Sequence, residues 1–308
     1  MKLVVIDPGV QCTVQAGARA GFRHAGVPAS GPADAVSMAL ANRLVGNPSG
    51  AACLEISYGP AAFRLGTEVQ IGITGAPAPV SVNGEARPMH QTLTLAAGDV
   101  LEIGAATAGA RMYLALGGVL HADEFLGSAS TYLPAGLGGH EGRALRKGDE
   151  ICFDAVPRVP YVSTPTNMQP HVSSSYALRA VRGPDWSASA ESPADAACQV
   201  SPRTSRMGVE IEGAFPALDG AGQKPSSAVF PGALQVTPQG RGFLLLADGQ
   251  TTGGYPHLLQ VIRADRHLLG QLRPGDSLRF LLRTQAEAET ALRAKQTLLE
   301  AWLPDFRL

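Results

Sequence analysis

Short runs of alternating or continuous apolar residues, separated by turn-forming residues, dominate the chain. Examples are Glu68–Ile73, Val100–Ile103, Arg111–Leu116 and Glu150–Phe153. Between such runs, 36 glycines and 23 prolines interrupt the sequence every few residues. Short runs of this kind, bounded by turn residues, are typical of antiparallel sheets and barrels. The pattern therefore predicts a mainly β fold.

Three of these strands begin with the same turn. A glycine and an aspartate precede alternating residues in Ala97–Ile103, Lys147–Phe153 and Pro274–Phe280, which predicts a tight turn that starts each strand. Two longer stretches, 98–118 and 231–254, share an order of turn, short strand, loop, second strand and Gly-Gly pair. This order favours two related β-rich halves. Repeated use of one turn chemistry within β-barrels is the alternative explanation.

Two segments have helical periodicity instead. After Asp34, the apolar residues Val36, Leu40 and Leu44 recur at spacings of four, and a glycine and a proline then follow. These are the expected start, buried stripe and stop of a helix. The stretch 284–302 is rich in Ala, Glu, Gln and Leu and predicts a second helix that packs on a barrel or a partner.

A boundary between two domains is expected near the middle of the chain. Residues 157–170 carry four prolines together with Ser, Thr, Asn and Gln, which suits an exposed, extended connection. A chain of 308 residues is long enough for two domains. We therefore expect an N-terminal β domain over 1–160 and a C-terminal β domain over 175–308 that includes the terminal helix.

The composition predicts a soluble globular protein with no surface for nucleic acid or membrane. The formal net charge is −1, from 25 Lys+Arg and 26 Asp+Glu, which provides no extended charged footprint. The N-terminal apolar run meets Asp7 and Pro8 too early for a secretory signal. The four cysteines are far apart in sequence, so neither a zinc site nor a disulfide framework is expected. We expect a cytoplasmic protein that binds a small neutral or zwitterionic ligand or a protein partner.

The loop Asp248–Pro256 is the strongest candidate site on residue types alone. It follows the strand-like run Phe243–Ala247 and contains two adjacent glycines, which allow a ligand to approach the backbone closely. Its polar side chains supply both hydrogen-bond donors and acceptors. A plain turn between two strands is the alternative interpretation. The polar residues are Asp248, Gln250, Thr251, Thr252 and Tyr255.

A second candidate site lies between Thr13 and Asp34, in a loop rich in glycine, proline and charged residues. Either Ser30 or Asp34 is placed to cap the helix that follows, so capping explains one of them without chemistry. His24 is able to act as an acid or base near neutral pH. No partner is evident from its spacing, which favours a structural or surface histidine.

A third candidate is the segment Ser205–Gly213, in which Arg206 shortly precedes a glycine. A guanidinium presented there is able to bind a carboxylate or phosphate of a ligand. An ordinary surface ion pair with Glu210 or Glu212 is the alternative.

Several common motifs do not occur in the sequence. There is no G-x-x-x-x-G-K-[ST], H-E-x-x-H or G-x-S-x-G, which disfavours P-loop nucleotide binding, zincin chemistry and an α/β-hydrolase. No lysine is flanked by methionines, so we expect no covalent biotin on this chain. Because the sequence also lacks a zinc-ligand pattern, we expect no metal site.

Motifs in three regions of the chain match a known family. The N-terminal set is Thr13-Val14-Gln15, Arg19, Gly21, His24, Gly26-Val27-Pro28, Ser30-Gly31, Asp34, Ala41–Asn47, Leu54-Glu55 and Gly59-Pro60. The middle set is Gly127-Ser128, Ser130-Thr131, Gly138-Gly139, Gly142-Arg143 and Gly148-Asp149. The C-terminal set is Ser205–Gly208, Pro231-Gly232, Gln235-Val236, Gly240, Asp248–Pro256, Val261-Ile262, Ala264-Asp265 and Pro274–Asp276. In these motifs the chain resembles the allophanate hydrolase subunit 2 family, also called the biotin-dependent carboxyltransferase-like family, across nearly its whole length.

The resemblance implies two cyclophilin-like β-barrel domains and a subunit that acts on small amides together with other chains. Within the family, the chain is similar to a subunit of bacterial ATP-dependent 5-oxoprolinase, which opens 5-oxo-L-proline to L-glutamate. This implies ATP as a cofactor of the complex and a subunit 1 homologue as partner. A lactam-utilisation-type subunit is a further candidate partner.

Under this hypothesis, Gln250 and Thr252 hold the amide, Arg206 lies near a carboxylate or phosphate, and Asp34 or Asp248 acts as acid or base. The candidate catalytic residues are Asp34, Asp248 and Ser30. The candidate substrate-binding residues are Gln15, Arg19, His24, Arg206, Gln235, Gln250, Thr251, Thr252, Gly253, Gly254 and Tyr255.

Two alternative functions remain open, a second enzyme function and a function of a different class. One is the carboxyltransferase component of a urea carboxylase or urea amidolyase-type system, with biotin supplied on another chain. The other is a regulatory binding protein that antagonises a kinase inhibitor. The chain also departs from the usual family pattern, with Ala16, Ala18 and Ala20 in place of an acidic residue, a glycine and a proline. These departures predict a shifted specificity or a weakened activity.

Overall fold

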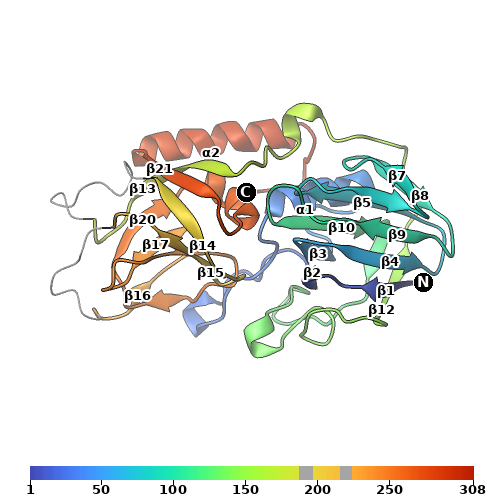
Figure 1. The fold of residues 1–308 in the computed structure, drawn as a ribbon, viewed down its shortest axis with the longest axis horizontal. Coiled ribbons are helices and arrows are strands. Elements are labelled where there is room, and N and C mark those ends of the chain that lie inside the picture. The colour runs from blue at the N-terminus through green and yellow to red at the C-terminus, as the bar shows by residue number, and fades with distance from the viewer. Residues whose placement is uncertain (187–196, 216–223) are drawn as a thin grey trace. The chain divides into compact units, whose positions relative to one another are not determined.

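The computed structural model describes residues 1–186, 197–215 and 224–308, which form two compact units (Figure 1). The first unit comprises Met1–Arg19, Ser30–Val172 and Leu299–Arg307. The second comprises Ala20–Ala29, Ser173–Leu298 and Leu308. The chain divides mainly after Val172. Residues 20–29 precede this division but belong to the second unit, and residues 299–307 follow it but belong to the first.

The first unit consists of two β-sheets and one helix. One sheet has seven strands in the order β11-β12-β1-β4-β9-β6-β7, and the other has five in the order β2-β3-β10-β5-β8. The seven strands are β1 (Lys2–Asp7), β4 (Ala61–Leu65), β6 (Val80–Val82), β7 (Glu85–Arg87), β9 (Val100–Ile103), β11 (Gly118–Leu120) and β12 (Glu150–Ala155). The five strands are β2 (Gln11–Gln15), β3 (Cys53–Ser57), β5 (Val69–Gly75), β8 (Thr92–Leu95) and β10 (Arg111–Leu116).

The five-stranded sheet is buried on both faces. Apolar side chains of both sheets form one core, which includes Leu3, Phe63 and Met112. A second cluster joins residues of α1 (Ala35–Leu44), among them Met38, to Tyr113 and other residues of the five-stranded sheet. Strands covered on both faces read as continuous apolar runs rather than alternating ones. This explains why β3, β5 and β10 are buried at every position.

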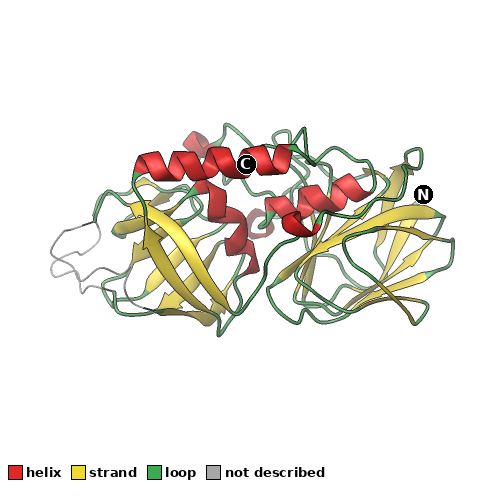
Figure 2. Ribbon diagram, turned by 90° about the horizontal axis from the view of Figure 1, so that it is seen from above, coloured by secondary structure: helices red, strands yellow, loops and turns green. Residues whose placement is uncertain are grey.

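The second unit is built around a barrel of strands (Figure 2). The barrel is closed, and its strands follow the order β13-β20-β17-β18-β15-β14-β21. A separate two-stranded sheet joins β16 (Ser227–Ala228) to β19 (Thr252–Gly253). The barrel strands are β13 (Ser175–Arg182), β14 (Cys198–Thr204), β15 (Gly208–Glu212), β17 (Ala233–Val236), β18 (Gly242–Leu245), β20 (His257–Val261) and β21 (Ser277–Leu282). The expected mainly β fold is thus confirmed, with the closed barrel in this unit and paired sheets in the first.

The predicted Gly-Asp turns are confirmed, and all three have the same geometry. The glycines have φ angles of 92°, 91° and 90° at Gly98, Gly148 and Gly275, a region that strongly favours glycine. In each turn, the aspartate side chain accepts a hydrogen bond from the backbone N–H three residues earlier, at 2.7, 2.7 and 3.0 Å. The aspartate therefore closes the turn that starts β9, β12 or β21.

Both predicted helices are confirmed, and each begins with a side-chain cap. Asp34 accepts from the backbone N–H of Ser37 at the start of α1. Thr284 and Glu287 form a reciprocal capping box at the start of α2 (Gln285–Glu300), with Thr284 N–H donating to Glu287 and Glu287 N–H donating to Thr284.

Gly72 allows α1 to pack closely against β5. A Cβ at this position would lie 2.5 Å from the Ala41 carbonyl oxygen and 2.8 Å from Leu44 Cβ. We expect Gly72→Ala to lower the free energy of unfolding by about 1–3 kcal/mol because the helix would have to shift. Gly50→Ala is the control, since its nearest atom would be 3.7 Å away. Equal urea-unfolding midpoints for the two variants would contradict this packing.

Candidate functional site

Part of the loop Asp248–Pro256 opens onto a cavity of about 440 Å³ in the second unit. This loop connects β18 to β20 and includes the short strand β19. Gln250 and Tyr255 from the loop line the cavity together with Gln235 of β17. The remaining lining residues are Arg203, Thr204, Ser205, Met207, Gly208, Phe243 and Leu245. The structure thus brings three of the predicted binding residues together.

A chain of side-chain amides fixes one wall of this cavity. Gln250 Nε2 donates to Gln235 Oε1 at 3.2 Å, and Gln235 Nε2 donates to the Tyr255 carbonyl at 3.0 Å. Gly253 is required here, because a Cβ would lie 2.4 Å from Gln235 Nε2. Among the described residues, Gln250 Oε1 accepts no hydrogen bond, so it is available to a donor on a ligand.

The threonines of the loop have structural roles. Thr251 is 8% exposed, and its carbonyl accepts from Val229 N–H at 3.0 Å. Thr252 pairs with Ala228 across the two-stranded sheet. Neither residue lines the cavity. Of the loop's polar side chains, only Gln250 and Tyr255 do so.

Arg206 and Asp248 form a buried ion pair beneath the loop. Arg206 Nε donates to Asp248 Oδ2 at 2.8 Å, and the two side chains are 3% and 1% exposed. Asp248 N–H also donates to the Arg206 carbonyl at 3.0 Å. The surface ion pair expected between Arg206 and Glu210 or Glu212 is corrected by this buried pairing. Glu210 instead binds two other arginines, Arg203 and Arg241.

The segment 20–29 brings Arg23 to the same loop within the second unit. Arg23 donates to the Val229 carbonyl and, at 3.3 Å, to the Gln250 carbonyl. Its guanidinium lies 5.2 Å from the centroid of the Phe230 ring, a cation–π distance. The neighbouring His24 is exposed and does not line the cavity. The sequence places Arg23 within the candidate site between Thr13 and Asp34, but Arg23 is not among the candidate substrate-binding residues.

Gln15 and Arg19 serve as internal braces of the first unit. Arg19 is 1% exposed and donates to the carbonyls of Phe125 and Ser130 at 2.8 and 2.9 Å. Gln15 donates to Thr13 Oγ1 and to the Thr131 carbonyl at 3.1 and 3.3 Å. Buried polar groups paired with backbone in this way stabilise loops. These contacts hold the long connections 121–149 against β2.

A buried polar cluster surrounds the start of α1 in the first unit. Asp34 accepts from Ser37 Oγ at 2.6 Å, and its own N–H donates to Tyr113 Oη at 2.8 Å. Tyr113 Oη donates to Glu55 Oε2 at 2.8 Å, and Arg111 lies 3.5 Å from Glu55. Burial raises the pKa of the Tyr113 hydroxyl well above its usual value, and the nearby Glu55 carboxylate adds to the rise. Asp34 therefore belongs to a connected network as well as capping the helix.

Ser30 and His90 have unusual conformations in the first unit. Their φ angles are 51° and 61°, in a region that most residues avoid. Ser30 Oγ and His90 Nδ1 are buried, and neither finds a hydrogen-bond partner among the described residues. Burial lowers the pKa of His90 to about 4, against the opposing charge of Asp34. His90 is therefore held as a neutral imidazole at neutral pH.

Sequence reasoning missed several of these residues for an identifiable reason. Tyr113, Glu55 and Arg111 lie within strand runs that read as core. The available signal was a charged residue within a run that reads as a strand covered on both faces. Charged groups are buried only with partners, so such a residue indicates a polar network. Arg203 lines the cavity from the end of β14. The fold brings it there, and no local pattern in the sequence indicates this position.

Two further cavities lie in the first unit. One of about 630 Å³ is lined in part by Ala16, Gly17 and Ala18. Ala16 and Ala18, two of the three alanines that depart from the usual family pattern, therefore line this cavity, and a larger residue at either position would reduce its volume. The other, of about 520 Å³, includes His90.

Breaking the Arg206–Asp248 pair tests its structural role. We expect Arg206→Met to lower the free energy of unfolding by about 3–5 kcal/mol, because the Asp248 carboxylate stays buried without its cation. Adding Asp248→Asn should recover part of this loss, since no unpaired charge remains. Arg293→Met is the control, because its pair with Glu289 is exposed and is worth less than about 1 kcal/mol. Similar urea midpoints for Arg206→Met and the control would refute the burial argument.

The lowered pKa of His90 predicts that the protein loses stability in acid. Its folded pKa of about 4 lies below the unfolded value of about 6.5, so only the unfolded state takes up a proton between these values. The free energy of unfolding should therefore fall as pH drops from about 6.5 to 4, by at most about 1.4 kcal/mol per pH unit.

His90→Asn should flatten this pH dependence, because asparagine tolerates positive φ and does not titrate. His171→Asn, at an exposed histidine, is the matched control and should leave it unchanged. Identical pH profiles for wild type and His90→Asn would contradict a neutral, buried His90.

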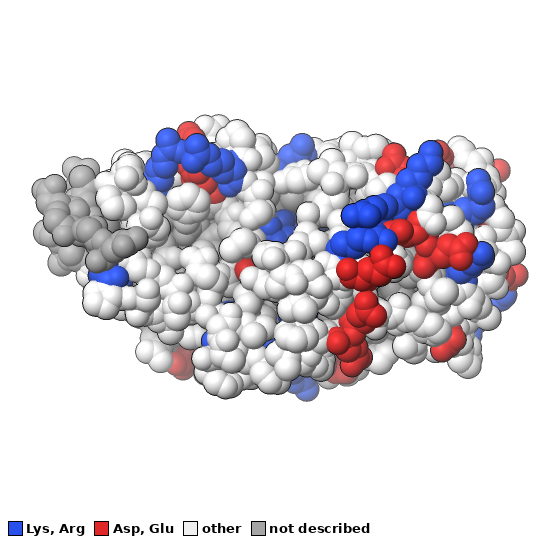
Figure 3. Space-filling model, turned by 90° about the horizontal axis from the view of Figure 1, so that it is seen from below, with Lys and Arg blue, Asp and Glu red and all other residues white. Residues whose placement is uncertain are grey.

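Charges on the surface of the first unit are mixed rather than separated. In the view of Figure 3, acidic and basic side chains lie next to one another. No helix among the described residues is both long and apolar enough to cross a membrane.

Comparisons with known proteins agree over most of the chain. A family model described as carboxyltransferase domain, subdomain A and B, matches residues 25–282. A 5-oxoprolinase subunit of Escherichia coli K12 is 32% identical over 298 residues, which cover 96% of this chain and 94% of that protein. Urea amidolyase of Lachancea kluyveri is 33% identical over 304 residues, covering 90% of this chain and 17% of that protein.

A solved structure of a urea amidolyase also matches this chain. The crystal structure of Kluyveromyces lactis urea amidolyase matches with a TM-score of 0.91 and 26% identity over 98% of this chain. The match spans only 20% of that structure's chain. The chain therefore spans nearly all of the bacterial subunit but a fifth or less of the urea amidolyases. It belongs to the carboxyltransferase domain, subdomain A and B, family.

Proposed function

We propose that this chain is a subunit of an ATP-dependent 5-oxoprolinase, which binds a small cyclic amide in the Gln235–Gln250 cavity. The observation that carries the proposal is the pair of side-chain amides lining a 440 Å³ cavity. A site built to hydrogen-bond a polar ligand discriminates strongly against ligands without the matching groups. The similarity to a 5-oxoprolinase subunit over nearly its full length supports the same assignment.

The chemistry of the substrate fits the groups that line the cavity. A lactam offers an N–H donor and a carbonyl acceptor, and Gln250 has a free amide oxygen to accept from that N–H. Arg203, whose side chain is 70% exposed, supplies a cation for the carboxylate of 5-oxoproline. The side chains of Met207 and Phe243 provide an apolar surface for the ring methylenes.

In this proposal the chain binds and orients the lactam, and partner chains contribute to the reaction. A lactam carbonyl is a poor electrophile, and transfer of the terminal phosphoryl group of ATP to its oxygen, with release of ADP, would activate the carbonyl carbon. Water would then add to that carbon, the C–N bond would break to open the ring, and hydrolysis of the resulting acyl phosphate would release glutamate and phosphate. Gln250 and Arg203 would hold the amide in position for that step. The subunit 1 homologue and a lactam-utilisation-type subunit are the proposed partners.

A carboxyltransferase role in a urea amidolyase-type system is the second candidate. The TM-score of 0.91 to a urea amidolyase favours it. Urea also offers amide N–H donors to Gln250. In that case the carboxyl group would come from carboxybiotin on a carrier supplied by another chain.

Activity of the reconstituted complex distinguishes these functions. Co-expressed with its partner subunits, the chain should release glutamate from 5-oxoproline only when ATP is present. We expect Gln250→Ala to lower kcat/KM for 5-oxoproline by about 10–100-fold, because one hydrogen bond to the ligand is lost. Coupled measurement of ADP and glutamate provides the readout.

Gln199→Ala is the matched control, because this glutamine is exposed on β14 and lies outside the cavity. It should retain full activity. An intact complex that releases no glutamate would exclude the 5-oxoprolinase role, and carboxybiotin decay accelerated by urea would favour the second candidate. Partner binding lost in Gln250→Ala, with no ATP-linked activity in the wild type, would indicate a regulatory protein.

A further inference from the structure

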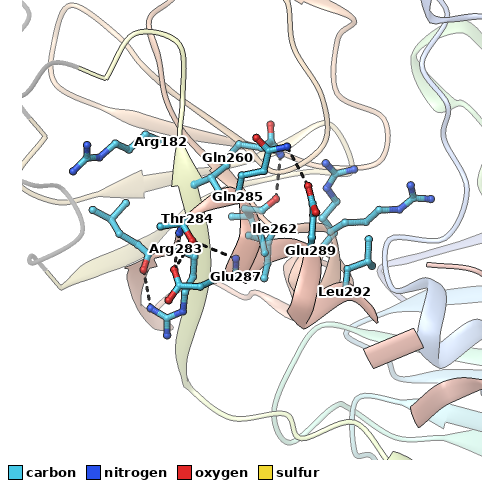
Figure 4. Close-up of a pocket in the computed structure, with 15 residues that line it drawn as sticks. Arg182, Gln260, Ile262, Arg283, Thr284, Gln285, Glu287, Glu289 and Leu292 are labelled. Carbon is cyan, nitrogen blue, oxygen red and sulfur yellow. Dashed lines mark hydrogen bonds between the residues drawn. The ribbon is translucent and has the colours of Figure 1, made fainter. Parts of the chain in front are cut away.

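A second cavity of the second unit, of about 780 Å³, has a composition suited to an anion. It lies among β13, β20, the helical segment that follows β20, and the start of α2 (Figure 4). Arg182, Arg263, Arg266 and Arg283 line it, against two glutamates. It shares no lining residue with the Gln235–Gln250 cavity.

Arg263 and Arg266 line this cavity, and the charge of Arg23 also acts on Arg266. Burial, followed by the charges of Arg263 and Arg23, lowers the pKa of Arg266 to about 10. Arg266 Nε and Arg23 Nη1 are both buried, and neither has a hydrogen-bond partner among the described residues. Among the residues that the structure describes, none of these three arginines forms an ion pair with a carboxylate. Buried donors left in this state are costly unless a ligand satisfies them.

The two glutamates of the cavity are engaged elsewhere. Glu287 accepts from Thr284 N–H and Oγ1 at 2.7 and 2.9 Å, as part of the helix cap. Glu289 accepts from Gln285 Nε2 at 3.1 Å and lies 3.8 Å from Arg293. Neither carboxylate therefore neutralises the arginine cluster.

The other two arginines do not contribute to the cluster. Figure 4 shows Arg182 and Arg283 extending away from Gln260 and Glu289. Arg182 stacks over the Trp186 ring at 5.4 Å, and Arg283 donates to the Leu282 carbonyl at 2.7 Å. Positive charge without a carboxylate partner is thus concentrated at Arg23, Arg263 and Arg266.

The remaining wall is apolar and the size suits a metabolite. Val261, Ile262, Leu282 and Leu292 line it. Cavities of about 300–1,000 Å³ with apolar walls and a few converging polar groups are typical of small-molecule sites. Arginine forks bind phosphate oxygens in paired hydrogen bonds, and a doubly charged group offsets repulsion among several guanidiniums better than a single carboxylate.

We propose that Arg263 and Arg266, with the charge of Arg23 adding to the positive potential, form a phosphate-binding site at this cavity, which takes either free phosphate or the phosphate group of a nucleotide. This site goes beyond the proposed lactam site and does not depend on it. The Arg266 guanidinium binds from the cavity wall, and Arg263 closes the site from the exposed side. The apolar wall holds the remainder of a larger ligand.

Calorimetric titration of the whole chain with inorganic phosphate, ATP and L-glutamate tests the proposal. At constant ionic strength, phosphate or ATP should bind saturably, and Arg263→Gln and Arg266→Gln should each weaken binding by about tenfold or more. Arg266→Lys should restore part of the affinity. Tighter binding of ATP than of phosphate identifies a nucleotide as the source, and equal affinities identify free phosphate.

Arg279→Gln, on the exposed face of β21, is the matched control and should bind as wild type does. Arg263 is exposed, so its variant should keep the wild-type unfolding temperature even if Arg266→Gln does not fold. No saturable binding of phosphate or ATP, or binding unchanged in Arg263→Gln, would overturn the proposal. Arginine-dependent binding of glutamate alone would overturn the phosphate assignment in favour of a carboxylate.

Discussion

The buried ion pair between Arg206 and Asp248 is the interaction on which the candidate site depends. It joins the start of β15 to the end of β18 through both side chains and backbone. Because both groups are almost fully buried, neither is able to leave without stranding a charge. The pair therefore fixes where the loop Asp248–Pro256 leaves the barrel. Gln250 and Tyr255 reach the cavity from that fixed point.

This arrangement divides the residues of one polar loop into those that stabilise its conformation and those that line the cavity. Asp248 and Thr251 face inward and make structural contacts, whereas Gln250 and Tyr255 line the cavity. The glycine at 253 leaves room for the Gln235 amide. A site of this kind needs a rigid second layer, because a small displacement of a binding group costs activity. The loop is therefore polar for two physical reasons. Some of its polar groups stabilise the loop, and others line the cavity that we propose binds the ligand.

The sequence predicted the elements well because their signals are local. The Gly-Asp turns, the Asp34 cap and the Thr284 cap depend on residues within three positions of one another. Residue types alone indicated the site loop, and the resemblance to a family added an expected class of ligand. Nothing local, however, indicates that Arg206 reaches Asp248, 42 residues away. The segment 20–29 likewise joins the second unit only through long-range contacts such as Arg23 to Val229.

The central claim is that the Gln235–Gln250 cavity binds a small cyclic amide, and a crystal structure tests it most directly. Crystals of the chain with its partner subunits should be grown with 5-oxoproline and without ATP, so that the lactam is not consumed. We predict electron density for the lactam against Gln250 Oε1, with its carboxylate toward Arg203. An empty cavity, with the lactam bound at another place in the complex, would contradict the account.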